Sequence, residues 1–232
     1  TYYFNDINTI STFKSHNKYT TSKLINPHLG INKKIEKHSS QGIVKGVYEY
    51  YHYKHDGYSD EGWGCAYRSL QTLFSWFLMN GFKKEGLYVP SILEIQKTLV
   101  NIGDKPKKII DSQDWIGAFE VSIILNELLG IESKIMHVTS GADLESKGRE
   151  LIKHFEVHGT PIMIGGGVYA YTILGVEYDR VKGKCLFLIL DPHYNGSDDL
   201  KTIVSKGWCN WKDASLFKKE NFYNLCLPQI PK

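Results

Sequence analysis

The strongest constraint on the fold is that helix-forming and strand-forming segments occupy different parts of this 232-residue chain. Helical apolar spacing and helix-capping residues recur between residues 65 and 159, with one strand-like segment at 133–138. After residue 160 the chain becomes β-branched and aromatic, and its last two strand-like segments are joined by a short polar turn at 179–183. This order predicts an α+β fold in which the helices are segregated from a mainly antiparallel sheet.

The first predicted helix follows residue 65, where apolar side chains recur at helical spacing on one face. These side chains are Leu70, Leu73, Phe74, Phe77 and Leu78. A second helix is expected after Ser91, which can cap it while Glu94 closes a capping box. Two further helices are expected at 117–130 and 143–159.

The N-terminal part of the chain differs in composition from the rest. Residues 1–45 are rich in Asn, Ser, Thr and Lys and show little apolar periodicity, so we expect an N-terminal arm or the remnant of a preceding domain. Residues 46–232 are expected to form one compact domain. The aromatic segment 44–53 is predicted to be a strand, followed by a polar loop that ends at Gly64.

Composition and charge exclude several classes of protein. The chain mixes 28 basic with 25 acidic residues, whereas nucleic-acid-binding proteins concentrate Lys and Arg on one face, so no nucleic-acid partner is expected. No stretch approaches the roughly 20 apolar residues of a membrane span, so a soluble protein is expected. The four cysteines are too widely spaced for a disulfide scaffold or a structural zinc site, and we expect neither a metal nor a cofactor.

Cys65 is the first candidate for chemistry, because it lies where a glycine-containing loop enters the first predicted helix. The partial positive charge of a helix N-terminus favours the thiolate, which is the nucleophilic form of cysteine. Gly62 and Gly64 beside it favour a site that backbone or substrate must approach closely. A buried structural cysteine is the alternative, and these residues alone support both interpretations equally.

Asp191 and His193 could supply the base that a thiol nucleophile needs. They follow the apolar segment 186–190 and stand two positions apart, so on extended backbone their side chains point to the same side. A carboxylate there can orient an imidazole toward a thiol. Without Cys65, two ordinary turn residues would be the preferred interpretation.

Tyr53, at the end of the predicted strand 44–53, could donate a hydrogen bond to a developing oxyanion. The alternative is one more aromatic residue in a tyrosine-rich strand, which the residues alone favour.

The glycine run Gly165, Gly166 and Gly167 with Ala170 matches a relaxed dinucleotide-binding pattern, which would suit an oxidoreductase. That site requires a following helix, but a strand-forming segment follows instead. A bend in a sheet explains these glycines better.

Seven motifs in the same order along the chain resemble the cysteine proteases specific for ubiquitin-fold modifier 1. They are "GWGCAYRSLQTL", "WIGAFEV", "GTPIMIGGGV", "TILGV", "LILDPHY", "KGWCNW" and "YNLCLPQ". The resemblance runs from about residue 46 to residue 228 and implies a papain-like catalytic domain at 46–232 from a longer, two-domain member. One departure is Tyr171, where many relatives are expected to have His.

The resemblance also implies a role for each candidate residue. Cys65 would be the nucleophile, His193 the general base and acid, Asp191 the orienting carboxylate and Tyr53 the oxyanion donor. A narrow substrate cleft is expected to include the glycine run 165–167, with Trp115 as a wall.

The function that the resemblance implies is a thiol protease acting on ubiquitin-fold modifier 1 and its conjugates. It would cleave after the modifier's C-terminal glycine, both maturing the precursor and releasing the modifier from lysine side chains. We expect a cytoplasmic monomer, held at the endoplasmic reticulum by a membrane adaptor through a missing N-terminal region. A protease of the autophagy-modifier type and a non-catalytic modifier-binding module are the alternatives.

Overall fold

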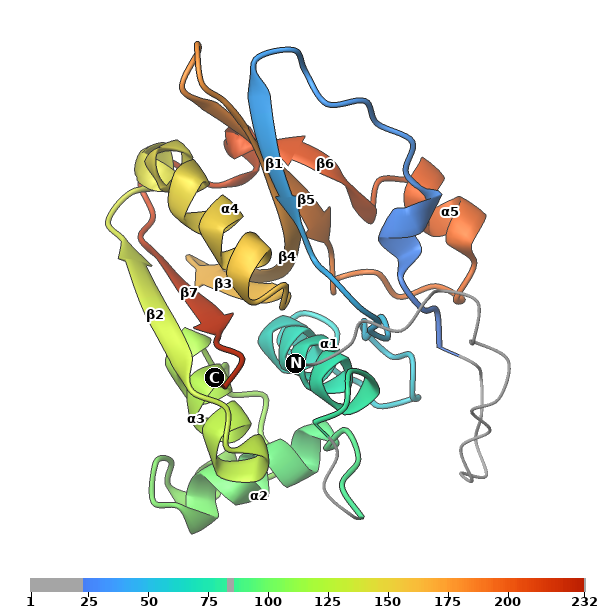
Figure 1. Cartoon of the computed structure of the whole chain (residues 1–232). Coiled ribbons are helices and arrows are strands. Elements are labelled where there is room, and N and C mark those ends of the chain that lie inside the picture. The colour runs from blue at the N-terminus through green and yellow to red at the C-terminus, as the bar shows by residue number, and fades with distance from the viewer. Residues whose placement is uncertain (1–22, 83–85, 232) are drawn as a thin grey trace.

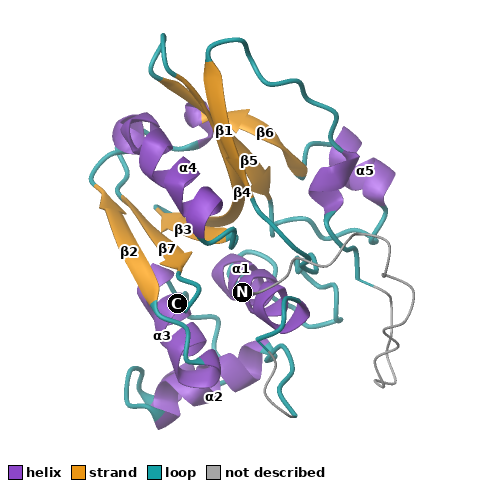
Figure 2. Ribbon diagram, viewed as in Figure 1, coloured by secondary structure: helices purple, strands orange, loops and turns teal. Residues whose placement is uncertain are grey.

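The protein is described by a computed structural model that covers residues 23–82 and 86–231. The helices are α1 (Cys65–Met79), α2 (Ile92–Asn101), α3 (Ala118–Leu129), α4 (Gly148–Val157) and α5 (Leu200–Ser205). The strands are β1 (Ser39–Ile43), β2 (Ser133–Val138), β3 (Ile162–Gly166), β4 (Tyr169–Asp179), β5 (Lys184–Leu190), β6 (Cys209–Asp213) and β7 (Tyr223–Pro228). Figure 1 and Figure 2 show their arrangement.

The strands form a seven-stranded sheet in the order β2-β7-β3-β4-β5-β6, with β1 paired to β4. Every paired neighbour is antiparallel. The predicted hairpin joins β4 to β5 through the turn after Asp179. These findings confirm the predicted α+β class with a mainly antiparallel sheet.

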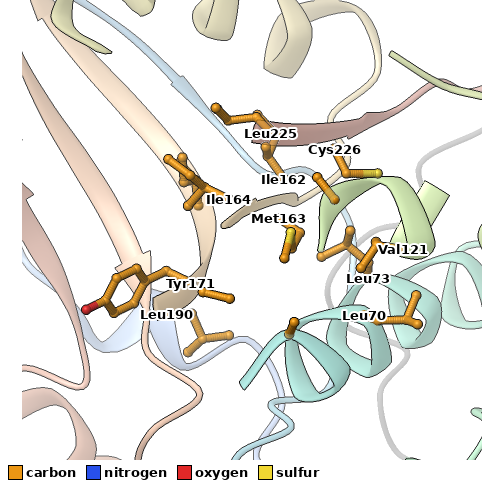
Figure 3. Packing of buried hydrophobic residues seen from close by; sticks show 14 of the residues in the cluster. Leu70, Leu73, Val121, Ile162, Met163, Ile164, Tyr171, Leu190, Leu225 and Cys226 are labelled. Carbon is orange, nitrogen blue, oxygen red and sulfur yellow. The ribbon is translucent and has the colours of Figure 1, made fainter. Parts of the chain in front are cut away.

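Helix α1 lies in the centre of the molecule, between the sheet and α2 (Figure 1). It contacts β3, β4 and α3, while α4 covers β1 and β4. Figure 3 shows Leu70 and Leu73 of α1 beside Met163 of β3 and Val121 of α3, and all four side chains are fully buried. The apolar face predicted for this helix is therefore part of the main core.

The helix ends follow the predicted capping chemistry. The Glu94 N–H donates to Ser91 Oγ over 3.3 Å, and the Ser91 N–H donates to Glu94 Oε2 over 2.8 Å, so the predicted capping box forms. Gly130 ends α3 in the left-handed conformation with φ of 70°.

The segment predicted as a helix at 143–159 is divided in two. A 3₁₀ helix, Gly141–Lys147, precedes α4, and Gly148 is the first residue of α4. A Cβ atom on Gly148 would lie 2.5 Å from Cys185 Sγ and 2.8 Å from Cδ2 of Tyr178. The glycine therefore allows α4 to pack closely against the hairpin of β4 and β5, which the helical pattern did not indicate.

Gly148→Ala is expected to lower the free energy of unfolding by about 1–3 kcal/mol, because an extra methyl group overpacks this contact. The overpacking exceeds the gain of about 1 kcal/mol that alanine normally brings to a helix. Chemical denaturation of the variant measures the difference. Gly117→Ala is the control, since the nearest atom to its added Cβ would lie 3.5 Å away. Equal stability of wild type and Gly148→Ala would contradict the packing argument.

The segment 44–53 is not a strand, apart from a single bridge between Glu49 and Ile25. One of its edges faces residues 24–26, where the Asn26 N–H donates to the Tyr48 carbonyl over 3.2 Å and the Tyr50 N–H donates to the Leu24 carbonyl over 2.9 Å. Its other edge runs alongside α1. On that edge, alternate N–H groups donate to side-chain oxygens. Residues 47, 49 and 51 donate to Asn80, Ser75 and Thr72, respectively. The strand prediction was wrong because aromatic, β-branched sequence indicates an extended backbone without indicating what accepts its hydrogen bonds.

The N-terminal part contributes to the sheet. Residues 39–43, which the composition assigned to the arm, form β1, while residues 1–22 lie outside the described residues. The division into an arm at 1–45 and a domain at 46–232 stays a prediction. Within residues 23–82 and 86–231, no helix has the length and apolar character needed to span a membrane.

Candidate active site

Cys65 is the first residue of α1 and is 8% exposed. The turn before it is tightly packed, because a Cβ on Gly64 would lie 2.6 Å from Cβ of Asp60. Glycine at position 64 lets the loop pass close to the Asp60 side chain and enter the helix at Cys65. The thiol thus lies at the positive end of the helix dipole.

Asp191 and His193 follow directly after β5. Oδ1 of Asp191 lies 2.5 Å from Nδ1 of His193 and also accepts the His193 backbone N–H over 3.0 Å. Because this carboxylate faces Nδ1, Nε2 is the ring nitrogen left for other contacts.

Asp191 and Cys65 are the two groups that act most strongly on the charge state of His193. Burial alone would lower the pKa of His193, but the hydrogen bonds to Asp191 and Cys65 and the charges of these two groups raise it to about 9. The structure therefore brings Cys65, His193 and Asp191 together, from a helix N-terminus to the end of a strand.

Tyr53 packs against His193. Its ring centroid is 5.3 Å from that of His193 at an interplanar angle of 90°. Burial, then the charge on Cys65 and a hydrogen bond to Cys65, raise the pKa of Tyr53, and the Gly62 backbone is a further hydrogen-bond partner. The phenol stays protonated at neutral pH beside the sulfur, as an oxyanion donor must.

Tyr169 and Tyr171 also contact His193, which the sequence reasoning missed. Their ring centroids lie 5.4 Å and 5.3 Å from the His193 ring. The two residues are two positions apart on β4, so they share a face of the sheet, and this alternation was the signal available in the sequence.

An ion-pair network near Cys65, centred on a buried arginine, was also missed. Arg68, one turn after Cys65, is fully buried, and its Nε donates to Asp60 Oδ2 over 2.7 Å. Its terminal nitrogens donate to both carboxylate oxygens of Asp56, over 2.8 Å and 2.9 Å. Asp60 Oδ1 also accepts the N–H of Lys54, so the network joins α1 to the residue that follows Tyr53.

Trp115 is 53% exposed and borders an open groove of about 550 Å³. The groove is also lined by Lys105, Pro106, Lys108, Ile109, Gln113 and Asp114. The Tyr67 hydroxyl donates to the Asp114 carbonyl over 2.9 Å, which fixes the backbone next to Trp115 against the first turn of α1.

The glycine run lies at the end of β3, and its small size is required by packing. A Cβ on Gly166 would collide with the Phe222 carbonyl and the Tyr223 ring, and Gly167 has a φ of +58°. The β3–β4 hairpin that carries these glycines reaches His193 through Tyr169, which pairs with Gly166. Within residues 23–82 and 86–231, no group of three or more His, Cys, Asp or Glu side chains is arranged to hold a metal ion.

The chain is similar to several known proteins. The chain is 50% identical over 214 residues to Ufm1-specific protease 2 of Danio rerio, covering 92% of this chain and 53% of that protein. It is 49% identical over 213 residues to Ufm1-specific protease 2 of Homo sapiens, covering 92% and 45%. It is 56% identical over 195 residues to the probable Ufm1-specific protease of Oryza sativa subsp. japonica, covering 82% and 30%. The chain thus spans about half or less of the length of these relatives.

The solved structures include a similar fold. The crystal structure of UfSP from C. elegans superposes with a TM-score of 0.81 at 46% sequence identity, covering 92% of this chain and 38% of that one. This similarity confirms the predicted papain-like α+β class. The sequence model of peptidase family C78 matches residues 39–226, which is most of the chain. The chain therefore belongs to peptidase family C78.

Proposed function

We propose that this chain is the catalytic domain of a thiol protease that cleaves after the C-terminal glycine of ubiquitin-fold modifier 1. It matures the modifier's precursor and removes the modifier from lysine side chains. The observation that carries the proposal is the grouping of Cys65, His193, Asp191 and Tyr53, in which Asp191 is hydrogen-bonded to Nδ1 of His193 and Cys65 raises the pKa of both His193 and Tyr53. The names of the similar proteins supply the choice of modifier.

The proposed reaction begins when His193 takes the proton of Cys65 and the thiolate attacks the glycyl carbonyl carbon. The oxyanion that forms accepts hydrogen bonds from the Tyr53 hydroxyl and from backbone N–H groups near Cys65. When the intermediate collapses, the C–N bond breaks and His193 gives its proton to the leaving amine. Water, deprotonated by His193, then hydrolyses the thioester and releases the modifier with a free carboxylate.

The substrate cleft is proposed to lie between Trp115 and the hairpin that carries Gly165, Gly166 and Gly167. Trp115 is linked to the first turn of α1 through Asp114 and Tyr67, and the hairpin reaches His193 through Tyr169. A narrow cleft would suit a substrate that ends in glycine.

The cellular setting is proposed from the family resemblance alone. The chain acts as a monomer in the cytoplasm, at the surface of the endoplasmic reticulum. A membrane adaptor holds the protein there. Size-exclusion chromatography with light scattering tests the monomer.

Two fluorogenic probes test the proposed substrate. One is ubiquitin-fold modifier 1 and the other an autophagy modifier, each with a fluorogenic amide at its C-terminal glycine. Release from the first probe alone supports the proposal. Release from the second alone assigns the chain to autophagy-modifier processing, and binding of the first modifier without any release identifies a non-catalytic module.

Tyr53→Phe is expected to lower kcat by about 10²-fold, because it removes one oxyanion donor while keeping the ring against His193. Steady-state hydrolysis of the amide probe measures the loss. Tyr51→Phe is the matched control, since it removes the hydroxyl that donates to Glu49 in the same segment. A loss below threefold in Tyr53→Phe would show that Tyr53 has only a packing role.

A further inference from the structure

His52 is a buried side chain beside the active site for which the reaction gives no role. It precedes Tyr53 and is 1% exposed. Its Nδ1 lies 3.0 Å from the carbonyl oxygen of Tyr53 and 3.1 Å from that of Tyr194. A carbonyl oxygen can only accept, so Nδ1 carries a proton and shares one N–H between the two oxygens.

These two carbonyls belong to the two backbone segments that carry Tyr53 and His193. The segments are also joined by the Tyr53 N–H, which donates to the Pro192 carbonyl over 2.9 Å, and by the Tyr50 hydroxyl, which donates to the Asp191 carbonyl. His52 adds a side-chain contact to the carbonyl of Tyr53 itself and to that of the residue after His193. Its ring therefore bridges the segment that carries Tyr53 and the segment that carries His193.

The His52 ring is itself held on several sides. Nε2 lies 3.0 Å from Oδ1 of Asp198. The rings of Tyr50 and Tyr194 are each 5.0 Å from it, and the ring of His55 is 5.6 Å away. A buried polar group with this many partners has one favourable position, since losing a partner leaves an unsatisfied donor or acceptor.

We propose that His52 is a positioning residue, which holds Tyr53 and His193 at their working distance from Cys65 through the shared Nδ1 hydrogen bond. The inference rests on the proposed function, since it assigns these residues to one reaction. A misplacement of about 1 Å in a catalytic group can cost about 10²-fold in rate, so a small shift of either segment has a large effect.

Two substitutions separate the Nδ1 contact from the rest of the side chain. In His52→Asn the amide nitrogen can occupy the place of Nδ1 and donate to the two carbonyls, but Asp198 loses its contact. In His52→Gln the amide nitrogen can reach the place of Nε2 and Asp198, but the two carbonyls lose their donor. Glutamine fills the volume of histidine better than asparagine does, so a role in packing alone predicts the opposite order of activity.

The expected result is that kcat for the amide probe falls by about 10²-fold in His52→Gln and by less than about fivefold in His52→Asn, with KM little changed. Thermal unfolding is measured in parallel and is expected to show His52→Asn as the less stable variant. His137→Gln, the same change on the exposed face of β2, is expected to leave kcat unchanged. Equal kcat in the two His52 variants, or a larger loss in His52→Asn, would overturn the proposal.

Alkylation of Cys65 by iodoacetamide gives a readout that needs no modifier. Burial raises the pKa of Cys185, Cys209 and Cys226 to about 12, so these thiols stay protonated at pH 7 and Cys65 is the thiol that reacts. The second-order rate constant is expected to fall about tenfold in His52→Gln and to stay near wild type in His52→Asn, because only the first displaces His193. Equal alkylation rates in the two variants would also contradict the proposal.

The two readouts distinguish the positioning role from the proposed function. If the wild-type chain cleaves neither probe but His52→Gln is still alkylated more slowly than His52→Asn, the proposed substrate is wrong and His52 still positions His193. If the probe is cleaved and the two variants behave alike in both assays, the proposed function stands and the role of His52 is refuted. If His52→Gln does not fold, retention of near-wild-type kcat in His52→Asn supports the proposal and a 10²-fold loss there refutes it.

Discussion

Cys65→Ala is expected to lower kcat/KM for release of the C-terminal amide by about 10⁵-fold or more, the scale of loss seen when a nucleophile is removed from a catalytic triad. The alanine variant keeps the helix N-terminus and the loop that Gly64 and Asp60 form before it, but it has no atom that can form the thioester. Continuous fluorescence with the modifier probe measures the loss. Binding of the modifier is expected to persist, because the rest of the surface is unchanged.

Cys185→Ala is the control for this experiment. It removes another buried thiol, which lies near the start of β5, at the end of the strand away from Asp191. Its kcat/KM is expected to lie within threefold of wild type. Activity of Cys65→Ala above about one hundredth of wild type would exclude Cys65 as the nucleophile, since background catalysis without one is far lower.

Asp191→Asn is expected to lower kcat by about 10³- to 10⁴-fold and to move the basic limb of the pH profile to lower pH. The hydrogen bond and charge of Asp191 raise the pKa of His193 to about 9. The His193 imidazolium is therefore present below about pH 9 and lost above it. The wild-type rate is expected to decline above about pH 9. Without the carboxylate the pKa of His193 falls, so the variant loses its imidazolium at a lower pH.

The pH dependence of kcat/KM, measured from pH 5 to pH 10.5, tests this expectation. Asp179→Asn is the matched control, because it makes the same change at the opposite end of the β4–β5 hairpin, where Asp179 accepts the N–H groups of Val181 and Lys182. The basic limb of the Asp179→Asn pH profile is expected to coincide with that of wild type. An unchanged basic limb in Asp191→Asn would mean that another group controls the decline.

Local chemistry in the sequence was enough to predict most of the regular structure. The apolar spacing after Cys65 predicted α1, the pair Ser91 and Glu94 predicted the start of α2, and Gly130 marked the end of α3. Each of these signals involves residues within two turns of one another, so no knowledge of the tertiary fold was needed. The segment 44–53 was mispredicted because several of its N–H groups donate to side chains of α1 and of Asn80 just after it, more than twenty residues away in the sequence.

The candidate site shows the same limit. Cys65 was detectable from the loop and helix around it, and Asp191 with His193 from their two-residue spacing. The contacts of Tyr169 and Tyr171 with His193, and the position of His52 between two carbonyls, depend on distant segments meeting in space. The alternation along β4 places Tyr169 and Tyr171 on one face, but no local pattern says which distant side chain they meet, so only the folded chain reveals these contacts.

The site draws its thiol and its base from opposite parts of the polypeptide, with a consequence for the newly made protein. Translation of the 128 residues from Cys65 to His193 (193 − 65) takes roughly ten seconds at ordinary rates. Over that time α1 can emerge from the ribosome and begin to fold while Cys65 still lacks the imidazole that would activate it. The order of synthesis thus leaves Cys65 without its proposed base until β5 and the residues after it have been made.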